Sequence, residues 1–260
     1  MTRTGVALDG KVALVTGASR GIGRAIAERL AEDGAVVVVH YGSNAAAADD
    51  TVRSIESAGG KAFAAAADLS SLEQIQSLFE RVDSELDSRM GTNALDILVN
   101  NAGRSSPAHY QQLTPQQFDH LFAVNVRGAF RVTQLALTRM REGGRIINIS
   151  SVASRRATLS PIAVPYGMTK AALDAFTLGL AQDLGRRKIT VNTIAPGVVQ
   201  TDINAEALRP PEVRKMLEGQ TALGRLGEAT DIAGVAAFLA SEESRWVTGQ
   251  YIEVSGGLRL

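Results

Sequence analysis

Several residue types that define particular protein classes are absent or balanced in this chain. It contains no cysteine, which excludes disulfide bonds, thiolate metal sites and a cysteine nucleophile. Its 27 basic residues balance 27 acidic ones, so the charge does not indicate binding to nucleic acid or to an anionic membrane. No apolar run approaches the roughly 18 residues of a membrane span, and the polar start lacks a signal-like region. We therefore expect a cytoplasmic protein without nucleic-acid or membrane partners.

Alternating strand-like and helical segments are the main pattern that the chain does have. Hydrophobic residues make up 45% of the 260 residues, which is enough for a sizeable core. Alternating units of this kind form a parallel, doubly wound α/β sheet with helices on both faces. We expect a single domain over residues 1–260. The strand-like runs end near Val15, His40, Ala66, Val99, Ile149, Ile194 and Val254.

Two further stretches give local expectations. Thr114-Pro-Gln-Gln117 has a Thr cap, a proline in the first turn and a glutamine at the third position, which is typical of a helix start. We expect this helix to run to about Met140. The polar stretch 87–93 lies before the fourth strand, and we expect it to form a surface loop without an assigned function.

A glycine-rich turn, Thr16–Gly23, follows the strand-like run Lys11–Val15 and leads into a helical pattern. Such a turn forms an anion site, because free N–H groups and the helix dipole point at a pyrophosphate. Its spacing, Gly-x3-Gly-x-Gly, differs from the standard Gly-x-Gly-x-x-Gly fingerprint. The alternative is an ordinary tight connection between a strand and a helix. We favour a dinucleotide site built on Gly17, Gly21 and Gly23.

A second group of residues has the chemistry of a proton donor. Tyr166 and Lys170 are four residues apart, so on a helix they project from one face. A nearby ammonium favours the phenolate, which we expect to lower the tyrosine pKa from about 10 and make Tyr166 a general acid or base. Alone, the pair is also typical of a helix surface. Ser151 strengthens the interpretation because it follows a strand-like run, where ligands collect in parallel sheets, although Ser150 competes for its role.

Together these motifs resemble the short-chain dehydrogenase/reductase family, and the resemblance extends from Lys11 to Gly257. It implies a Rossmann-type sheet of about seven strands in the order 3-2-1-4-5-6-7. It also implies an NAD(P)-dependent oxidoreductase that acts on CH–OH or C=O groups. The most similar subgroup is the 3-oxoacyl-carrier-protein reductases, whose substrate is carried by an acidic protein.

The family resemblance also implies roles for individual residues. Ser151, Tyr166 and Lys170 match the catalytic serine, tyrosine and lysine, and Asn125 matches a helix asparagine that holds a water for proton relay. Asp68 and Leu69 match an adenine contact, and Pro196–Thr201 matches the segment that holds the nicotinamide carboxamide. The residues implied to bind the dinucleotide are Gly17, Ser19, Gly21, Ile22, Gly23, Asp68, Leu69, Asn101, Ala102, Gly103, Tyr166, Lys170, Pro196, Gly197, Val199 and Thr201.

Simpler structural roles stay open for some of these positions. Asp68 is also consistent with a loop carboxylate beside a helix-capping box at Ser70-Ser-Leu-Glu73. Asn101 and its neighbour Asn100 are also typical of turns. Thr201 is also consistent with a helix N-cap before Asp202.

The end of the second strand favours NADP over NAD. NAD enzymes usually carry an acidic residue about 20 residues after the glycines, which binds the ribose 2′-hydroxyl. Here Tyr41-Gly-Ser-Asn44 has no carboxylate, and Ser43 and Asn44 can donate hydrogen bonds. Arg20, inside the glycine turn, can pair with a 2′-phosphate, unless it only faces solvent. We include Tyr41 with these residues in the predicted site.

The substrate is expected to be a partly apolar carbonyl compound. Residues 202–220 are expected to form an amphipathic lid that includes apolar Ile203, Met216 and Leu217. Arg186-Arg-Lys188 and Arg155-Arg156 are candidate docking residues for a carrier protein, although they are equally consistent with solvated charges. The spacing between Ser151 and Tyr166 is about two residues longer than is usual in the family.

The overall expectation is an NADP-dependent ketone reductase that assembles as a homotetramer, or at least a dimer. The helices that start at Thr114 and carry Tyr166 have apolar and small faces, and two isologous interfaces generate a closed tetramer. Alternatives are an alcohol or sugar dehydrogenase, a dehydratase or epimerase, and a nucleotide-sensing protein. No metal is expected, because His40, His109 and His120 are scattered, and we place them at the surface or at the cofactor edge.

Overall fold

The computed structural model describes residues 8–106, 108–156, 163–202 and 204–259. Seven strands form one sheet in the order β3-β2-β1-β4-β5-β6-β7, and every neighbouring pair is parallel. This confirms the predicted strand order and the Rossmann-type fold. The strands are β1 Val12–Val15, β2 Val36–Tyr41, β3 Lys61–Ala66, β4 Leu95–Asn100, β5 Met140–Ile149, β6 Thr190–Pro196 and β7 Tyr251–Val254.

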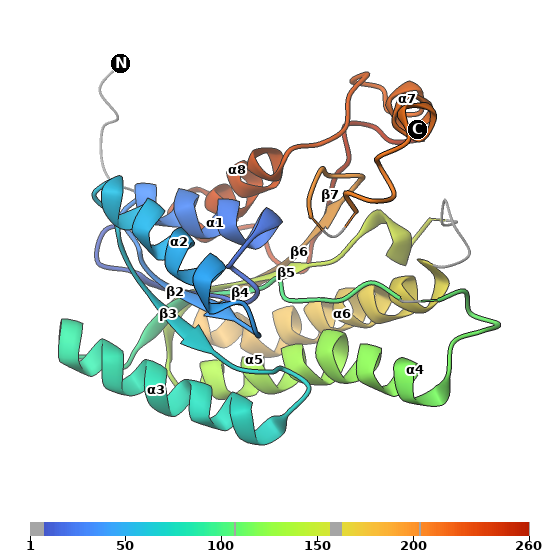
Figure 1. Cartoon of the computed structure of the whole chain (residues 1–260). Helices are drawn as coiled ribbons and strands as arrows, with labels where there is room; N and C mark the ends of the chain where they lie inside the picture. The colour runs from blue at the N-terminus through green and yellow to red at the C-terminus, as the bar shows by residue number, and fades with distance from the viewer. Residues whose placement is uncertain (1–7, 107, 157–162, 203, 260) are drawn as a thin grey trace, which may run out of the picture.

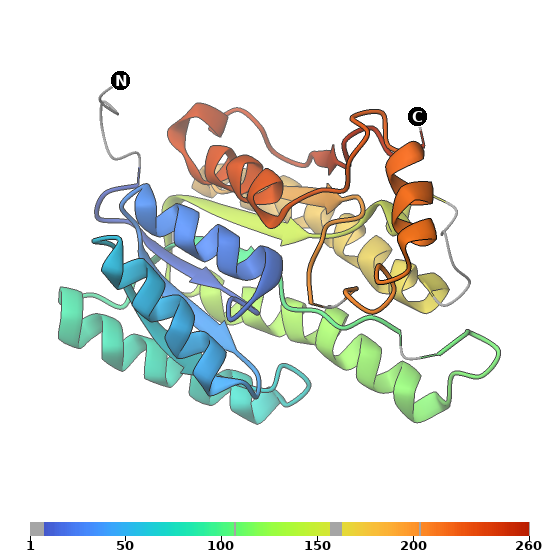
Figure 2. The same cartoon turned by 45° about the horizontal axis from the view of Figure 1, so that its top comes forward.

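Helices cover both faces of the sheet (Figures 1 and 2). The described helices are α1 Gly21–Glu32, α2 Ala45–Ser57, α3 Leu72–Met90, α4 Pro115–Phe122, α5 Ala129–Leu137, α6 Ala163–Leu184, α7 Pro211–Gly219 and α8 Ala229–Ala240. Short helical turns are the π-helical η1 Ala123–Gly128 and the 3₁₀ turns η2 Val152–Ser154, η3 Gly185–Arg187 and η4 Glu242–Ser244.

Successive residues of a central strand point to opposite faces of the sheet and pack into two separate hydrophobic cores. Ala13 and Val15 pack with residues of α1, α2 and α8 on one face. Val12 and Leu14 pack with residues of α3, α5 and α6 on the other. A central parallel strand is buried on both faces, which explains why these strands read as continuous apolar runs instead of alternating ones.

The helix predicted from Thr114 begins as expected but is shorter and irregular. Thr114 and Gln117 form a reciprocal capping box at the start of α4. The path then passes through the π-helical η1 and ends at Leu137. The predicted end at Met140 is wrong, because Met140 pairs with Leu95 as the first residue of β5. The polar residues that follow Met140 hide this strand start in the sequence.

The surface loop predicted at 87–93 is also wrong over its first half. α3 continues to Met90 and ends at Gly91, which adopts the left-handed conformation with φ 66°. Buried Leu86 holds this last turn against the sheet, and Arg89 Nε pairs with Glu85 Oε2 at 2.9 Å. A polar solvent face on a helix resembles a loop when the buried positions are few.

Within the described part of the chain, no helix has both the length and the apolar character required to cross a bilayer.

Candidate active site

The predicted site residues meet at the carboxyl edge of the sheet. In a parallel sheet all strands end at the same edge, and the strand order reverses between β1 and β4, which is where ligands bind in such folds. The segments after β1, β4, β5 and β6 carry the glycine turn, Asn101–Gly103, Ser151 and Gly197–Thr201. The loop before α4 and helix α7 extend beyond this same side of the molecule (Figures 1 and 2).

Close packing around the glycine turn explains two of its glycines. A Cβ on Gly23 would overlap the carbonyl oxygen of Gly17 and the side-chain nitrogen of Asn101. A Cβ on Gly17, where φ is 65°, would lie 2.9 Å from the Cα of Ala102. Asn101 donates from Nδ2 to the carbonyl oxygens of Thr16 at 2.9 Å and Gly17 at 3.1 Å. Asn101, just after β4, therefore fixes the backbone of the glycine turn after β1 through these two hydrogen bonds.

Thr16 is a residue whose role sequence reasoning missed. Its hydroxyl accepts hydrogen bonds from the backbone N–H groups of Asn101 at 2.9 Å and Ala102 at 3.0 Å, and donates to the carbonyl of Val99 at 3.2 Å. The threonine thus ties the end of β1 to the end of β4. Only its position as the first residue after a buried strand gave a signal for this role.

His40 is buried under the glycine turn, so a surface position is wrong for it, whereas the alternative at the cofactor edge stays a prediction. Its Nδ1 accepts from the N–H of Gly17 at 3.1 Å, and its Nε2 lies 3.1 Å from the carbonyl oxygen of Ala67. These two partners fit the neutral ring protonated at Nε2. Burial lowers the pKa of His40 to about 4, against a smaller opposing effect of the Ala67 carbonyl. The neutral ring therefore links the turn to the ends of β2 and β3.

A substitution at Gly23 tests how far cofactor binding depends on this packing. We expect Gly23→Ala to weaken NADPH binding by at least tenfold, because overpacking of about 1–3 kcal/mol displaces the turn. Fluorescence titration with NADPH measures the effect. Gly234→Ala is the matched control, since a Cβ there meets nothing within 4 Å. Equal NADPH affinity in Gly23→Ala and the wild type would show that the turn adapts.

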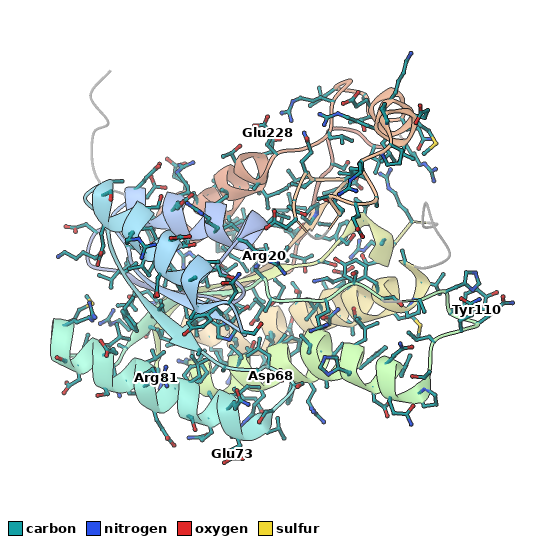
Figure 3. All side chains as sticks on the ribbon, viewed as in Figure 1. Arg20, Asp68, Glu73, Arg81, Tyr110 and Glu228 are labelled. Atoms are coloured by element: carbon teal, nitrogen blue, oxygen red, sulfur yellow. The ribbon has the colours of Figure 1, made fainter. Side chains whose placement is uncertain are left out.

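The residues predicted to select NADP lie around the first turn of α1 and the end of β2. Arg20 is the N-cap residue of α1, and within the described residues its exposed guanidinium forms no ion pair (Figure 3). Ser43 is exposed, whereas Tyr41 packs partly against the core. Asn44 Oδ1 caps α2 by accepting a hydrogen bond from the N–H of Ala47 at 3.1 Å. The side-chain amide hydrogens of Asn44 are therefore the part of it that can donate to a phosphate.

Asp68 takes part in local backbone structure at the end of β3. Its Oδ1 accepts from the N–H of Ser70 at 2.8 Å, and this bond is the main reason that its pKa is lowered. The capping box predicted at Ser70–Glu73 is wrong by one residue. Ser71 caps α3 by accepting from the N–H of Gln74, and Gln74 Oε1 accepts from the N–H of Asp68 at 2.9 Å. The adenine contact of Asp68 stays a prediction.

The structure brings Ser151, Tyr166 and Lys170 together. Ser151 follows β5 and its side chain hydrogen-bonds that of Tyr166 on α6. Lys170 is buried on the same helix and donates from Nζ to the carbonyl of Ile149 at 2.7 Å. Ser150, the rival candidate, donates its hydroxyl to the carbonyl of Lys170 at 3.2 Å. Ser151 is therefore the serine that faces Tyr166.

Asn125 completes this group from η1. Its Oδ1 accepts from the N–H of Arg104 at 2.8 Å, and its Nδ2 donates to the Arg104 carbonyl at 2.9 Å and to the Thr169 hydroxyl at 3.0 Å. A Cβ on Gly103 would lie 3.4 Å from Lys170 Nζ and 3.5 Å from Asn125 Oδ1. Both amide hydrogens of Asn125 are used within the chain, so its relay water stays a prediction.

The expectation that Lys170 lowers the pKa of Tyr166 is not met in the chain alone. Burial raises the pKa of Tyr166 to about 12, and the hydrogen bond with Ser151 only partly offsets this. Burial also lowers the pKa of Lys170 to about 8, against a smaller raising effect of Asp174. The ammonium lies 5.5 Å from the Tyr166 ring centroid. Sequence spacing indicated which groups meet, but not how strongly burial disfavours their charges.

The segment after β6 crosses over the glycine turn. A Cβ on Gly21 would lie 3.4 Å from the Thr201 side chain, so the two segments are in contact range. The backbone N–H of Gly197 donates to the Val254 carbonyl at 3.0 Å, and Val199 is buried in a bridge with Gly227. The helix N-cap predicted at Thr201 is wrong, because the next helix, α7, starts at Pro211.

The candidate carrier-docking residues are not free at the mouth of the site. Arg186, Arg187 and Lys188 lie just before β6, at the edge of the sheet opposite the site. Arg155 faces Asp174, with Nε 3.6 Å from Oδ2. Arg156 pairs with Glu253 at 2.8 Å. The lid residue Ile203 lies outside the described residues.

Comparisons with known proteins identify the family to which the chain belongs. Residues 17–259 match the family model described as enoyl-(acyl carrier protein) reductase. An uncharacterized oxidoreductase of Methylorubrum extorquens is 47% identical over 97% of this chain and 99% of its own length. A versicolorin reductase of Emericella nidulans is 40% identical over 96% of each chain. The chain belongs to the short-chain dehydrogenase/reductase family.

A solved structure extends this comparison to three dimensions. The angucycline C-6 ketoreductase LanV, crystallised with bound NADP, is 47% identical and superposes with a TM-score of 0.92 over 99% of this chain and 98% of its own. The predicted class of the protein, an NAD(P)-dependent oxidoreductase, is confirmed by these family relationships.

Proposed function

We propose that this short-chain dehydrogenase/reductase uses NADPH to reduce a ketone, with Ser151, Tyr166 and Lys170 as its catalytic residues. The observation that carries the proposal is the convergence of these three side chains beside the glycine turn, at one edge of the sheet. The ketoreductase activity in the names of its relatives supports the reaction, and the bound NADP of LanV supports the cofactor.

The chain's own residues divide the work of the reaction. NADPH, when bound, supplies the hydride. Tyr166 donates its hydroxyl proton to the substrate oxygen, and Ser151 hydrogen-bonds the same oxygen and fixes its position. The protonated amine of Lys170 stabilises the phenolate left on Tyr166 and binds the ribose hydroxyls. Asn125 holds the loop at Arg104 against α6, and the relay water implied for this residue is part of the proposal.

The glycine turn and Arg20 are the proposed cofactor contacts. The glycine turn is proposed to hold the pyrophosphate at the N-terminus of α1, where the N-cap residue Arg20 forms no side-chain hydrogen bond to the first turn. The exposed Arg20 is proposed to pair with the 2′-phosphate, together with Ser43, which is exposed two residues after the end of β2. Segment 197–201 is the proposed contact for the nicotinamide, and the approach of Thr201 to Gly21 places the end of this segment next to the glycine turn.

The proposed substrate is a polycyclic aromatic ketone. One relative is named as a versicolorin reductase and another as an angucycline ketoreductase, so the names give these compounds as their substrates. Apolar side chains exposed near the site suit such a substrate. Met216 on α7 is 50% exposed, and Leu223, which is 70% exposed, follows α7 and donates its N–H to the carbonyl of Gly256 beyond β7. We propose residues 202–220 as the lid over it.

A 3-oxoacyl thioester is the second candidate substrate. The description of the matching family model, an acyl-carrier-protein enzyme, favours it. Against a carrier-bound form, the basic residues expected to dock the carrier lie at the far edge of the sheet or are paired within the chain.

A substrate panel distinguishes these functions. NADPH oxidation is followed by absorbance with a polycyclic aromatic ketone, a 3-oxoacyl thioester and a simple aliphatic ketone. We expect the highest kcat/KM with the aromatic ketone. A dehydratase or epimerase would convert its substrate without net NADPH oxidation, and a nucleotide-sensing protein would bind NADPH without turnover on any of the three.

We also propose that the chain assembles as a homotetramer. A cavity of about 710 Å³ lies on the face shared by η1, α5 and α6, where Phe130, 45% exposed, contacts Phe176 with ring centroids 5.4 Å apart. This apolar face supports an interface with a second copy. The C-terminal strand β7, at the open edge of the sheet, offers the second interface.

Light scattering tests the assembly. We expect a mass near four times the 27.4 kDa of one chain at micromolar concentration. Phe130→Glu is expected to produce smaller species, because a charge in an apolar interface is costly. Leu72→Glu is the matched control, an exposed apolar residue at the start of α3. A single species near the mass of one chain in the wild type would show that these faces are not interfaces.

A further inference from the structure

Asp174 is a buried carboxylate without a part in the mechanism described above. It lies on α6 with only 7% of its surface exposed. Neither of its carboxylate oxygens has a hydrogen-bond partner among the described residues. Burying an ionised carboxylate without a hydrogen bond is costly, so an unusual electrostatic environment must stabilise it. That environment includes the proposed catalytic lysine.

Lys170 and Asp174 are four residues apart on α6, so their side chains project from the same helix face. Lys170 is itself buried, and its ammonium donates to the carbonyl of Ile149. A single neutral acceptor does not offset the cost of burying a charge. Asp174 supplies the opposite charge on the same face, one helical turn away.

A second cation holds Asp174 from the other side. Arg155, just after η2, places its Nε 3.6 Å from Asp174 Oδ2. Its guanidinium stacks on the Tyr251 ring of β7 at 3.7 Å, which fixes the arginine in place. Tyr251 in turn donates to the carbonyl of Ser151 at 3.4 Å. The group therefore connects α6 and β7 with the segment that carries the proposed catalytic serine.

The ionisable groups around Lys170 and Asp174 come from three elements. On the side toward β4 and η1, the described neighbours of Lys170 include the neutral Gly103 and Asn125. The ionisable neighbours are Tyr166 on the same helix, Arg155 after η2, and Tyr251 with Glu253 on β7.

We propose that Asp174 is a positioning residue that keeps Lys170 protonated during catalysis, with Arg155 holding its carboxylate in place. The inference rests on the proposed role of Lys170. It gives this site an electrostatic support beyond the serine, tyrosine and lysine. The pKa of Lys170, lowered by burial to about 8 and raised in part by Asp174, places its loss of charge just above neutral pH. Small changes in the surroundings of Lys170 therefore change the fraction of this residue that is protonated near neutral pH.

The test is the pH profile of kcat/KM for NADPH-dependent reduction. Reduction requires charged Lys170, so activity falls as the pH rises through the pKa of that group. In Asp174→Asn we expect this alkaline limb to move about one pH unit lower, because a nearby opposite charge shifts a pKa by about that much or more. The loss in kcat/KM is then roughly fivefold at pH 8 and slight at pH 6.

Three further variants make the result specific. Asp174→Glu restores the charge and is expected to bring the limb back toward that of the wild type. Asp183→Asn makes the same change at an exposed position of α6 and is expected to leave the profile unchanged. Asp174→Ser is a second neutral variant whose hydroxyl can bond within the helix, for use if Asp174→Asn does not fold. Thermal unfolding is measured for all of them.

Each outcome decides the proposal. An unchanged alkaline limb in a folded neutral variant would overturn it, as would a rate loss of equal size at every pH. Failure of both neutral variants to fold, with Asp174→Glu folded, would make the carboxylate purely structural and would also overturn it. Lys170→Met separates this result from the proposed function, since full activity in that variant would remove the lysine itself from the catalytic set.

Discussion

Replacing Tyr166 by phenylalanine is expected to reduce ketone turnover about 10³-fold, since a positioned general acid contributes roughly 10²–10⁴-fold. The hydroxyl is the only group that Tyr166→Phe removes, and it is the group that hydrogen-bonds Ser151. The ring and its packing are retained, so NADPH affinity is expected to change little. Stopped-flow or steady-state assays of NADPH oxidation give the turnover rate, and fluorescence titration gives the NADPH affinity.

Tyr110→Phe is the matched control for this substitution. Tyr110 lies in the loop before α4 and is 53% exposed, at the outer edge of the molecule (Figure 3). The same hydroxyl loss there is expected to leave turnover unchanged. Turnover of Tyr166→Phe within a few-fold of the wild type would remove Tyr166 from the role of proton donor.

Replacing Arg20 by alanine is expected to weaken NADPH binding by about 10–100-fold and NADH binding hardly at all. Only NADPH carries the 2′-phosphate, and a hydrogen bond to a charged group contributes about 1.5–3 kcal/mol. The guanidinium of Arg20 is exposed at the start of α1 and forms no ion pair with the described residues, so its loss breaks no ion pair among them. Dissociation constants of both cofactors measure the effect.

Arg24→Ala controls for general changes in charge. Arg24 lies one turn further along α1 and pairs with Glu28 at 2.8 Å. We expect this variant to bind both cofactors as the wild type does. Equal losses for NADPH and NADH in Arg20→Ala, or a wild type that prefers NADH, would contradict selection of the 2′-phosphate by Arg20.

The strand order and the approach of the site residues were predictable from sequence, because both follow from local patterns. Apolar runs mark buried strands, and parallel topology brings their carboxyl ends to one edge. The i, i+4 spacing placed Tyr166 and Lys170 on one helix face, and the structure has them there. Ser151 followed from its position at a strand end.

Features that depend on long-range packing were not predictable. His40 reads as one more residue of an apolar strand, and only the fold shows that both ring nitrogens bond to the segments above it. The pKa of Tyr166 depends on burial by residues from several elements, which no local spacing reveals. The pairing of Arg155 with Asp174 joins residues 19 positions apart, and so the arginine resembled free surface charge in the sequence.

The most direct test of the proposed function is to trace the hydride. The wild-type enzyme is incubated with a polycyclic aromatic ketone and NADPH that carries deuterium at both C4 positions, and the product is analysed by mass spectrometry. Ketone reduction through this site predicts an alcohol with one deuterium on its carbinol carbon, formed in step with NADP. A product without deuterium, or conversion of the substrate while the labelled NADPH is not consumed, would contradict hydride transfer as the function of this chain.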